Sequence, residues 1–351
     1  MILENENKPH RYLLYIGQNY SFEILRPLQQ GLRNLNIEVV WFVSGNEVDV
    51  SLFQSDEKVL ISVIDVLRYN PTVTLVPGNE VLYFLPGIKV QVFHGLESKK
   101  KRRILLKGFY DLYCTCGKAQ TKRFRQLASK HGYFDVVETG WPKLDSLYSA
   151  RPLAEYKRAT KPIVLYAPTF SAKLTSVYAL FSQFELLSQQ DEYFILIKFH
   201  PKMHPACIAK YRRICNENMQ IVETNSITAL LQTADVMVSD TSSAVSEFSL
   251  LNKPVVTLNN VQPEKHLFNF SNPLDLIKQL QLATQKLKNG EEIVPQSYIN
   301  DLHSFRDGLS AKRVIAAVEH ILENGKQNNG PKPFNFFRKF KQRKKFNYWG
   351  F

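Results

Sequence analysis

The sequence predicts an α/β fold with two parallel-sheet domains in series. Residues 11–16 form an apolar run typical of a buried strand, residues 22–34 carry apolar side chains at helical spacing, and residues 37–43 suit a second strand. A strand, a helix and a strand joined by short links make a βαβ unit, whose strands are parallel. The same alternation begins again at residues 163–167, after a charged stretch that Pro152 and Pro162 bound.

These patterns divide the chain into four parts. We expect a first domain over residues 1–150, a linker over 151–161, a second domain over 162–327 and a basic aromatic tail over 328–351. In the first domain, further strands are expected at 58–64, 73–76, 80–84, 90–93 and 112–116, and helices at 65–69 and 118–131. In the second domain, strands are expected at 163–167, 194–198, 220–223, 234–239 and 254–258, and helices at 177–188, 226–233 and 244–251.

The charge balance indicates an anionic partner. The net charge of +13 fits a nucleic acid, a phospholipid surface or a phosphorylated substrate, and charge alone does not choose among them. The 4 cysteines have no zinc-type spacing, so we expect free thiols in a reducing compartment. No apolar run reaches the roughly 20 residues of a bilayer span, and the start of the chain does not resemble a signal peptide. The expected location is therefore the cytoplasm, or the cytoplasmic face of the membrane.

A histidine follows an apolar run in the first domain. His94 and Gly95 come directly after residues 90–93, and five basic residues follow: Lys99, Lys100, Lys101, Arg102 and Arg103. Open α/β sheets bind ligands at the carboxyl ends of their strands. His94 is therefore a candidate catalytic residue, while Gly95 and the basic run are candidates for contact with a phosphate-rich acceptor or a membrane.

Polar residues follow two strands of the second domain. Asp240, Thr241, Ser242 and Ser243 stand between a strand and a helix, where hydroxyls and free backbone N–H groups bind phosphate, although a simple helix cap is the alternative. Lys198 and His200 end another strand, where they could neutralise a diphosphate or be an ordinary surface pair.

Two other segments carry weaker signals. Residues around Gly17 lack the full G-x-G-x-x-G pattern, so a dinucleotide cofactor is poorly supported. Gly140 and Pro142 predict a turn, because glycine tolerates positive φ and proline fixes its own φ. In the tail, aromatic and basic residues interleave, which suits an anionic membrane interface, single-stranded nucleic acid or a solvated disordered segment.

An ordered set of motifs resembles the CDP-glycerol glycerophosphotransferase family, the teichoic-acid-type polymerases and primases. In chain order they are FHG at 93–95 with basic residues after it, TGWPKLD at 139–145, LYAPT at 165–169, KFHP at 198–201, ADVMVSDTSS at 234–243, NKP at 252–254 and FRDGLSAKR at 305–313. Each motif is short, whereas their order is specific, and the set covers roughly residues 90–318.

The resemblance implies a GT-B-like fold, with two Rossmann-like domains facing across a cleft, and no metal or other cofactor. It implies that His94 is the general base on the acceptor hydroxyl and that His200 contacts the donor diphosphate. It also implies that Ser242 and Ser243 hold the donor phosphates, and that Glu247 and Arg313 line the donor pocket.

The implied reaction transfers glycerol phosphate from CDP-glycerol to a hydroxyl of a cell-surface glycan or its lipid-linked precursor, with release of CMP. Such an enzyme of teichoic acid or capsule synthesis would work at the cytoplasmic membrane face, and no nucleic acid partner is expected. Thr241 and Glu247 stand where the family usually has Tyr and Asp, and residues 96–98 replace its usual small residues. A CDP-ribitol donor, a GT-B glycosyltransferase using a sugar nucleotide, and a non-catalytic protein binding anionic lipid or nucleic acid stay open as alternatives.

Overall fold

The chain folds into two α/β units, each built on one parallel sheet. The computed structural model describes residues 10–96, 104, 106–156, 161–224 and 227–349. One compact unit joins Met1–Tyr148 with Asn300–Phe351, and the other is Ser149–Ile299. The predicted fold class is confirmed, since neighbouring strands pair in parallel in both sheets, as in β1 with β4 and β8 with β11.

The first unit has a seven-stranded sheet of order β3-β2-β1-β4-β5-β6-β7. Its strands are β1 (Tyr12–Ile16), β2 (Val39–Val43), β3 (Val59–Leu60), β4 (Val73–Val76), β5 (Ile88–Gln91), β6 (Leu112–Thr115) and β7 (Asp135–Glu138). Its helices are α1 (Ser21–Asn34), α2 (Val63–Tyr69), α3 (Lys118–His131), α4 (Lys143–Ser149), α11 (Ser310–Asn324) and α12 (Phe336–Phe346). The strand order reverses between β1 and β4, which is the position where open sheets of this kind bind ligands.

The second unit has a six-stranded sheet of order β10-β9-β8-β11-β12-β13. Its strands are β8 (Ile163–Tyr166), β9 (Phe194–Ile197), β10 (Met219–Ile221), β11 (Val236–Ser239), β12 (Val255–Leu258) and β13 (Phe268–Phe270). Its helices are α5 (Phe181–Ser188), α6 (Pro205–Arg212), α7 (Thr228–Thr233), α8 (Ser243–Leu250) and α9 (Leu276–Lys288), and α10 (Gln296–Leu302) crosses into the first unit. Here the strand order reverses between β8 and β11.

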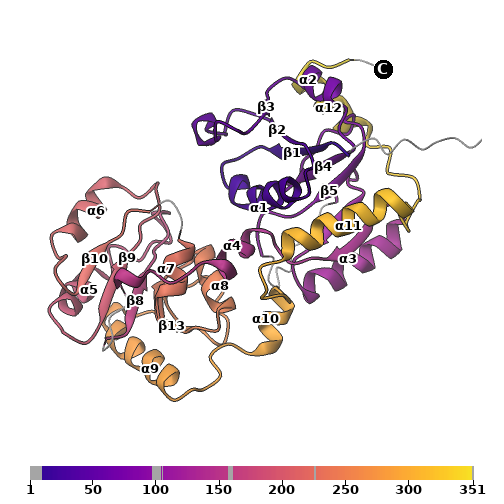
Figure 1. Ribbon diagram of the computed structural model, residues 1–351. Helices are drawn as coiled ribbons and strands as arrows, with labels where there is room; N and C mark the ends of the chain where they lie inside the picture. Colours follow the sequence, from indigo (N-terminus) through magenta and orange to yellow (C-terminus); the bar gives the residue numbers. More distant parts are fainter. Residues whose placement is uncertain (1–9, 97–103, 105, 157–160, 225–226, 350–351) are drawn as a thin grey trace, which may run out of the picture. The chain divides into compact units, whose positions relative to one another are not determined.

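The predicted second domain, residues 162–327, extends beyond the observed unit, which ends at Ile299. The reason is that α11 packs against α1, as Figure 1 also shows, with the yellow helix beside the indigo one. A Cβ at Gly31 of α1 would stand 2.8 Å from Ile315 Cδ1 of α11, so the two helices approach closely. The hydroxyl of Tyr12 also bonds to Glu319 of α11.

Three predicted segments differ in the structure. Residues 80–84 form a loop between β4 and β5 instead of a strand. Val81 and Leu82 are buried there, but neither belongs to a strand of the described chain. The helix expected at 177–188 begins only at Phe181. The tail forms α12 and is anchored to the first unit, where backbone and side-chain N–H groups of Gln327 and Asn328 donate to the Asp135 carboxylate.

All four cysteines are free thiols, as predicted, and Cys114, Cys116 and Cys207 are buried. None of the helices in the described part of the chain is long and apolar enough to cross a bilayer.

Candidate functional site

His94 lines a polar pocket of about 610 Å³ in the first unit, at the carboxyl ends of its central strands. Gly17 follows β1, Ser44 follows β2 and Gly78 follows β4, so the pocket lies where the strand order reverses. The Tyr20 ring, which is 41% exposed, lies beside the imidazole with a centroid separation of 5.6 Å. The predicted position of His94 just after the carboxyl end of a strand therefore agrees with the structure.

The backbone before His94 is held in an unusual conformation. Phe93 has φ of 59°, a left-handed value that a bulky side chain adopts only where its surroundings hold it. Its carbonyl accepts a hydrogen bond from the Trp141 indole N–H at 3.3 Å, and its ring is buried. The TGWPKLD motif thus supports the peptide that presents His94.

A second buried histidine supports this arrangement. His303 Nε2 accepts a hydrogen bond from the Trp141 backbone N–H at 2.9 Å, and burial lowers the pKa of His303 to about 4. The imidazole is therefore neutral near pH 7 and keeps the lone pair that Trp141 needs. Gly140 has φ of 80°, and a Cβ there would meet the Ser310 side chain at 2.5 Å, so the predicted turn requires glycine.

The same motif also caps α11. The Asp145 carboxylate accepts backbone N–H groups of Ser310 and Ala311 at 2.8 and 2.7 Å. A carboxylate at a helix N-terminus satisfies amides that have no partner inside the helix and interacts favourably with the helix dipole. This contact fixes α11, and with it Arg313, in the first unit.

The hydrogen bond of His94 selects one tautomer. Its Nδ1 lies 3.3 Å from the Pro77 carbonyl oxygen, which can only accept, so Nδ1 carries the proton. His94 is exposed, and its Nε2 atom then has a lone pair available. An imidazole in this state can accept a proton from a hydroxyl, which is what a general base does.

Gly95 is half-buried directly after His94. The predicted basic run, Lys99, Lys100, Lys101, Arg102 and Arg103, lies outside the described residues.

The predicted donor residues of the second unit lie at the carboxyl ends of β8, β9 and β11. Lys198 and His200 follow β9, and Asp240 to Ser243 follow β11, next to the β8–β11 reversal. The loop after β8 joins them, since the Phe170 ring stacks on the His200 ring with a centroid separation of 4.3 Å. The structure therefore brings these sequence-distant motifs to one edge of one sheet.

Asp240 holds this edge together from inside. Its carboxylate is fully buried and accepts the backbone N–H of Thr169 at 2.9 Å and both the N–H and the hydroxyl of Ser176 at 2.9 and 2.8 Å. Burial raises the pKa of Asp240, against the lowering effect of these donors. Predicted as a phosphate-binding residue, Asp240 instead has both carboxylate oxygens engaged by the loop after β8, so it positions that loop.

The hydroxyl residues that follow Asp240 divide into two roles. Ser242 caps α8, with its Oγ accepting the Ala244 N–H at 3.3 Å, and Thr241 Oγ1 accepts the Val261 N–H at 3.2 Å. Ser243, the first residue of α8, is exposed. The cap interpretation is therefore correct for Ser242, and the exposed first turn of α8 still offers hydroxyl and N–H groups that suit an anion.

His200 has the opposite tautomer to His94. Its Nδ1 accepts the Lys202 backbone N–H at 3.0 Å, so in the neutral ring the proton lies on Nε2 of this exposed residue. Burial and the nearby Lys202 and Lys198 lower the pKa of His200. Lys198 Nζ donates to the Phe199 carbonyl at 2.8 Å, and burial lowers the pKa of this lysine as well. Lys198 and His200 thus offer N–H donors to an anion at the carboxyl end of β9.

Two residues that were expected to line the donor pocket are engaged elsewhere in the fold. Glu247 is buried within α8. Arg313 belongs to the first unit, where its guanidinium bonds to Asp307 and lies 3.7 Å from the centroid of the Phe305 ring. Among the residues that the structure describes, no group of three His, Cys, Asp or Glu side chains could hold a metal ion.

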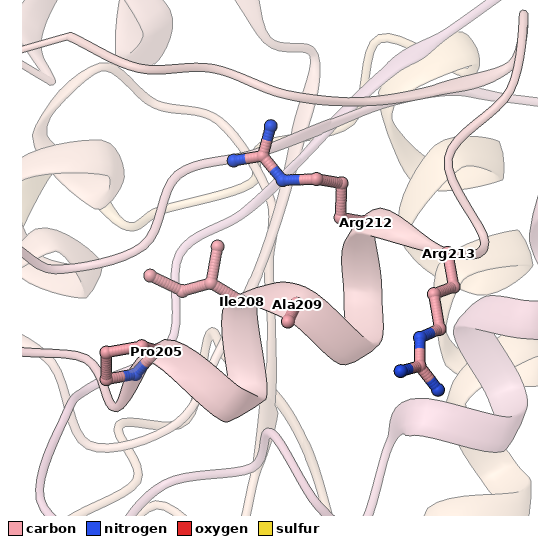
Figure 2. A pocket seen from close by; sticks show the side chains of 5 residues that line it. All are labelled: Pro205, Ile208, Ala209, Arg212 and Arg213. Carbon is pink, nitrogen blue, oxygen red and sulfur yellow. The ribbon is translucent and has the colours of Figure 1, made fainter.

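Two further hollows contain none of the predicted site residues. One, of about 420 Å³, lies along α6, and Figure 2 shows the side chains of Ile208 and Arg212 that line it. Arg212 in it is paired with Glu223 at 2.8 Å. The other, of about 610 Å³, follows α3.

Sequence reasoning missed several residues at these sites. Phe170, which stacks on His200, stood one position beyond the LYAPT motif, and Asn260, which donates to the Asp240 carbonyl at 2.9 Å, belonged to no motif. The contribution of Gln342, Lys345 and Phe346 to the His94 pocket was also missed, because the tail was expected to stand apart from the fold.

Comparison with known proteins identifies the family. The model of the CDP-Glycerol:Poly(glycerophosphate) glycerophosphotransferase family matches residues 87–320, which is more than half of the chain. The chain belongs to this family. It is therefore an enzyme of the phosphotransferase class, and the non-catalytic alternative is set aside.

Individual relatives agree. The teichoic acid glycerol-phosphate primase of Bacillus subtilis (strain 168) is 24% identical over 270 residues, which cover 66% of this chain and 69% of that protein. The teichoic acid ribitol-phosphate polymerase TarL of Staphylococcus aureus is 24% identical over 213 residues, 52% of this chain and 36% of TarL. The solved structure of the wall teichoic acid polymerase TagF superposes with a TM-score of 0.61 at 14% identity, covering 90% of this chain and 89% of TagF. That likeness supports the predicted GT-B-like fold class.

Proposed function

We propose that this glycerophosphotransferase-family enzyme transfers glycerol phosphate from CDP-glycerol to an acceptor hydroxyl of a surface glycan or lipid-linked precursor. The complementary tautomers of His94 and His200, both of which are exposed, carry the proposal. His94 offers a lone pair at Nε2, and His200 offers an N–H at Nε2. One can take a proton, and the other can stabilise negative charge.

In the proposed reaction, the acceptor oxygen attacks the phosphorus that bears glycerol, and its proton passes to His94. The bond from that phosphorus to the bridging oxygen breaks, and CMP leaves with the electron pair. The leaving phosphate gains charge, which the His200 N–H, the first turn of α8 at Ser243 and Lys198 would stabilise.

The donor is tested by ligand protection and product release. CDP-glycerol is expected to raise the melting temperature of the protein and to yield CMP when an acceptor is present, and UDP-sugars are expected to do neither. His200→Ala should weaken CDP-glycerol binding about tenfold or more, since a hydrogen bond to a charged group contributes about 1.5–3 kcal/mol. The matched control is His204→Ala, four residues further on, where the imidazole caps α6.

Two outcomes would redirect the proposal. Protection by a UDP-sugar, without protection by CDP-glycerol, would favour the glycosyltransferase alternative. Preference for CDP-ribitol over CDP-glycerol would assign the ribitol donor, an alternative supported by the similarity to TarL.

The tail supports a second proposal, that α12 binds an anionic membrane surface. Phe336, Phe337 and Phe340 are 56%, 77% and 48% exposed, an unusual arrangement for three aromatic rings on one helix. The exposed Lys341 and Lys344 lie on the same helix. Apolar rings with cationic neighbours suit the interface of a bilayer that contains anionic lipid.

Replacing Phe336, Phe337 and Phe340 together with serine is expected to weaken vesicle binding at least about a hundredfold, since each ring would lose about 1–2 kcal/mol of apolar burial. The measurement is co-sedimentation with phosphatidylcholine vesicles that contain or lack phosphatidylglycerol. The control replaces Val50, Ile61 and Ile64, which are similarly exposed, with serine. Equal losses in both variants, or binding without phosphatidylglycerol, would contradict this role.

A further inference from the structure

The C-terminal helix α12 contributes to the wall of the His94 pocket. Gln342, Lys345 and Phe346 line the same hollow as His94 and Tyr20. The family match ends at residue 320, so these residues lie beyond the part of the chain that the family model describes. The pocket therefore has a wall that is not part of the matched family core.

Side-chain contacts fix α12 to the loop between β4 and β5. The Gln342 amide oxygen accepts the Tyr83 backbone N–H at 3.0 Å, and its amide nitrogen donates to the Val81 carbonyl at 2.8 Å. Arg343 bonds to the Tyr83 hydroxyl, and the Tyr348 ring packs on Phe84 with a centroid separation of 4.7 Å. Because Gln342 satisfies both a donor and an acceptor of one loop, it sets the position of the helix along the pocket.

Lys345 is the cation that α12 places at this pocket. Glu47 in the pocket already accepts the Gln18 amide at 2.6 Å, and Glu80 pairs with Lys107 at 3.2 Å. The Lys345 ammonium lies 5.4 Å from the Phe346 ring centroid, and within the described chain it has no carboxylate partner. Its charge is thus available to a ligand, while hydroxyl and amide groups such as Ser44 and Asn79 line the pocket nearer the strands.

We propose that α12 completes the acceptor site and that Lys345 binds the phosphate of a polyol phosphodiester acceptor. The polar groups near His94 then bind the hydroxyls of the polyol. This inference rests on the proposed function, which assigns the His94 pocket to the acceptor. It assigns acceptor selection to Lys345, with Gln342 as the positioning residue that fixes the helix.

The probe is bis(glycerol) phosphate, a phosphodiester that carries two glycerol units, with uncharged diglycerol for comparison. Lys345→Gln in the full-length protein is expected to weaken binding of bis(glycerol) phosphate about tenfold, measured by titration calorimetry, and to leave diglycerol binding unchanged. Lys341→Gln removes the same charge from an exposed position of α12 that does not line the pocket, and should bind both probes as the wild type does. Gln342→Ala should weaken binding of both probes, because the helix that forms the wall is displaced. Gln342→Glu keeps an oxygen that accepts the Tyr83 N–H but loses the N–H that donates to the Val81 carbonyl.

In transfer assays, Lys345→Gln should raise the KM for a phosphodiester acceptor about tenfold at nearly unchanged kcat. Equal affinity of the wild type and Lys345→Gln for bis(glycerol) phosphate, or equal loss in Lys341→Gln, would overturn the inference. Protection by CDP-glycerol tests the proposed function separately. If CDP-glycerol protects the protein and Lys345→Gln binds the phosphodiester normally, only the role of Lys345 is wrong, whereas absent protection would count against the proposed function itself.

Discussion

His94→Ala is expected to lower CMP release by about 10²- to 10⁴-fold, the usual contribution of a positioned general base. The physical reason is that Nδ1 of His94 donates to the Pro77 carbonyl, which leaves Nε2 as the proton acceptor in a polar pocket. Alanine removes this acceptor and leaves the pocket open to water, which is a poor substitute at neutral pH. The measurement is the initial rate of CMP release at saturating CDP-glycerol and acceptor.

The folded state should survive this change, because His94 is exposed at the pocket, where its ring lies beside that of Tyr20. CDP-glycerol should therefore protect His94→Ala against thermal unfolding as it protects the wild type. His131→Ala removes an exposed imidazole at the end of α3 and is expected to keep full activity. Wild-type turnover in His94→Ala would rule out His94 as the base.

The fold class and the break near residue 150 followed from local patterns, whereas the place of α11 in the first unit did not. Residues 118–131 form the predicted helix with the predicted bounds, and Gly132 in the left-handed conformation ends it. The return of α11 to the first unit depends on its packing against α1, and on the Asp145 carboxylate that receives its first N–H groups. Contacts over such sequence separations have no local signature in the sequence. The predicted second domain therefore extends to residue 327, beyond the end of the observed unit at Ile299.

The candidate site could be predicted where a motif ends a strand. His94, His200 and Ser243 all stand at such ends, and parallel strands bring their carboxyl ends to one edge of the sheet. What the motif could not reveal is how each group is engaged. Asp240 is occupied by buried N–H groups and Ser242 by its own helix, and only three-dimensional contacts separate these supporting residues from exposed ones.

Asp240→Asn is expected to destabilise the protein by about 3 kcal/mol, although it replaces only one carboxylate oxygen with an amide nitrogen. The substitution also removes the negative charge. Oδ1 of Asp240 accepts the Thr169 N–H, and Oδ2 accepts both the N–H and the hydroxyl of Ser176. An asparagine offers one oxygen in place of two, so its NH₂ group must face an N–H donor. Each buried donor left without an acceptor costs about 1–3 kcal/mol.

The substitution should also affect the site proposed for CDP-glycerol, because the loop that Asp240 holds carries Phe170, which stacks on His200. Asp240→Asn should therefore weaken CDP-glycerol binding in addition to lowering the urea midpoint of unfolding. Asp191→Asn is the matched control, since that carboxylate is 79% exposed and an exposed ion pair contributes at most about 1 kcal/mol. If Asp240→Asn unfolded at the same urea concentration as Asp191→Asn, the buried acceptor would not be needed. In that case Asp240 would be free to serve the ligand, as the sequence motif alone had indicated.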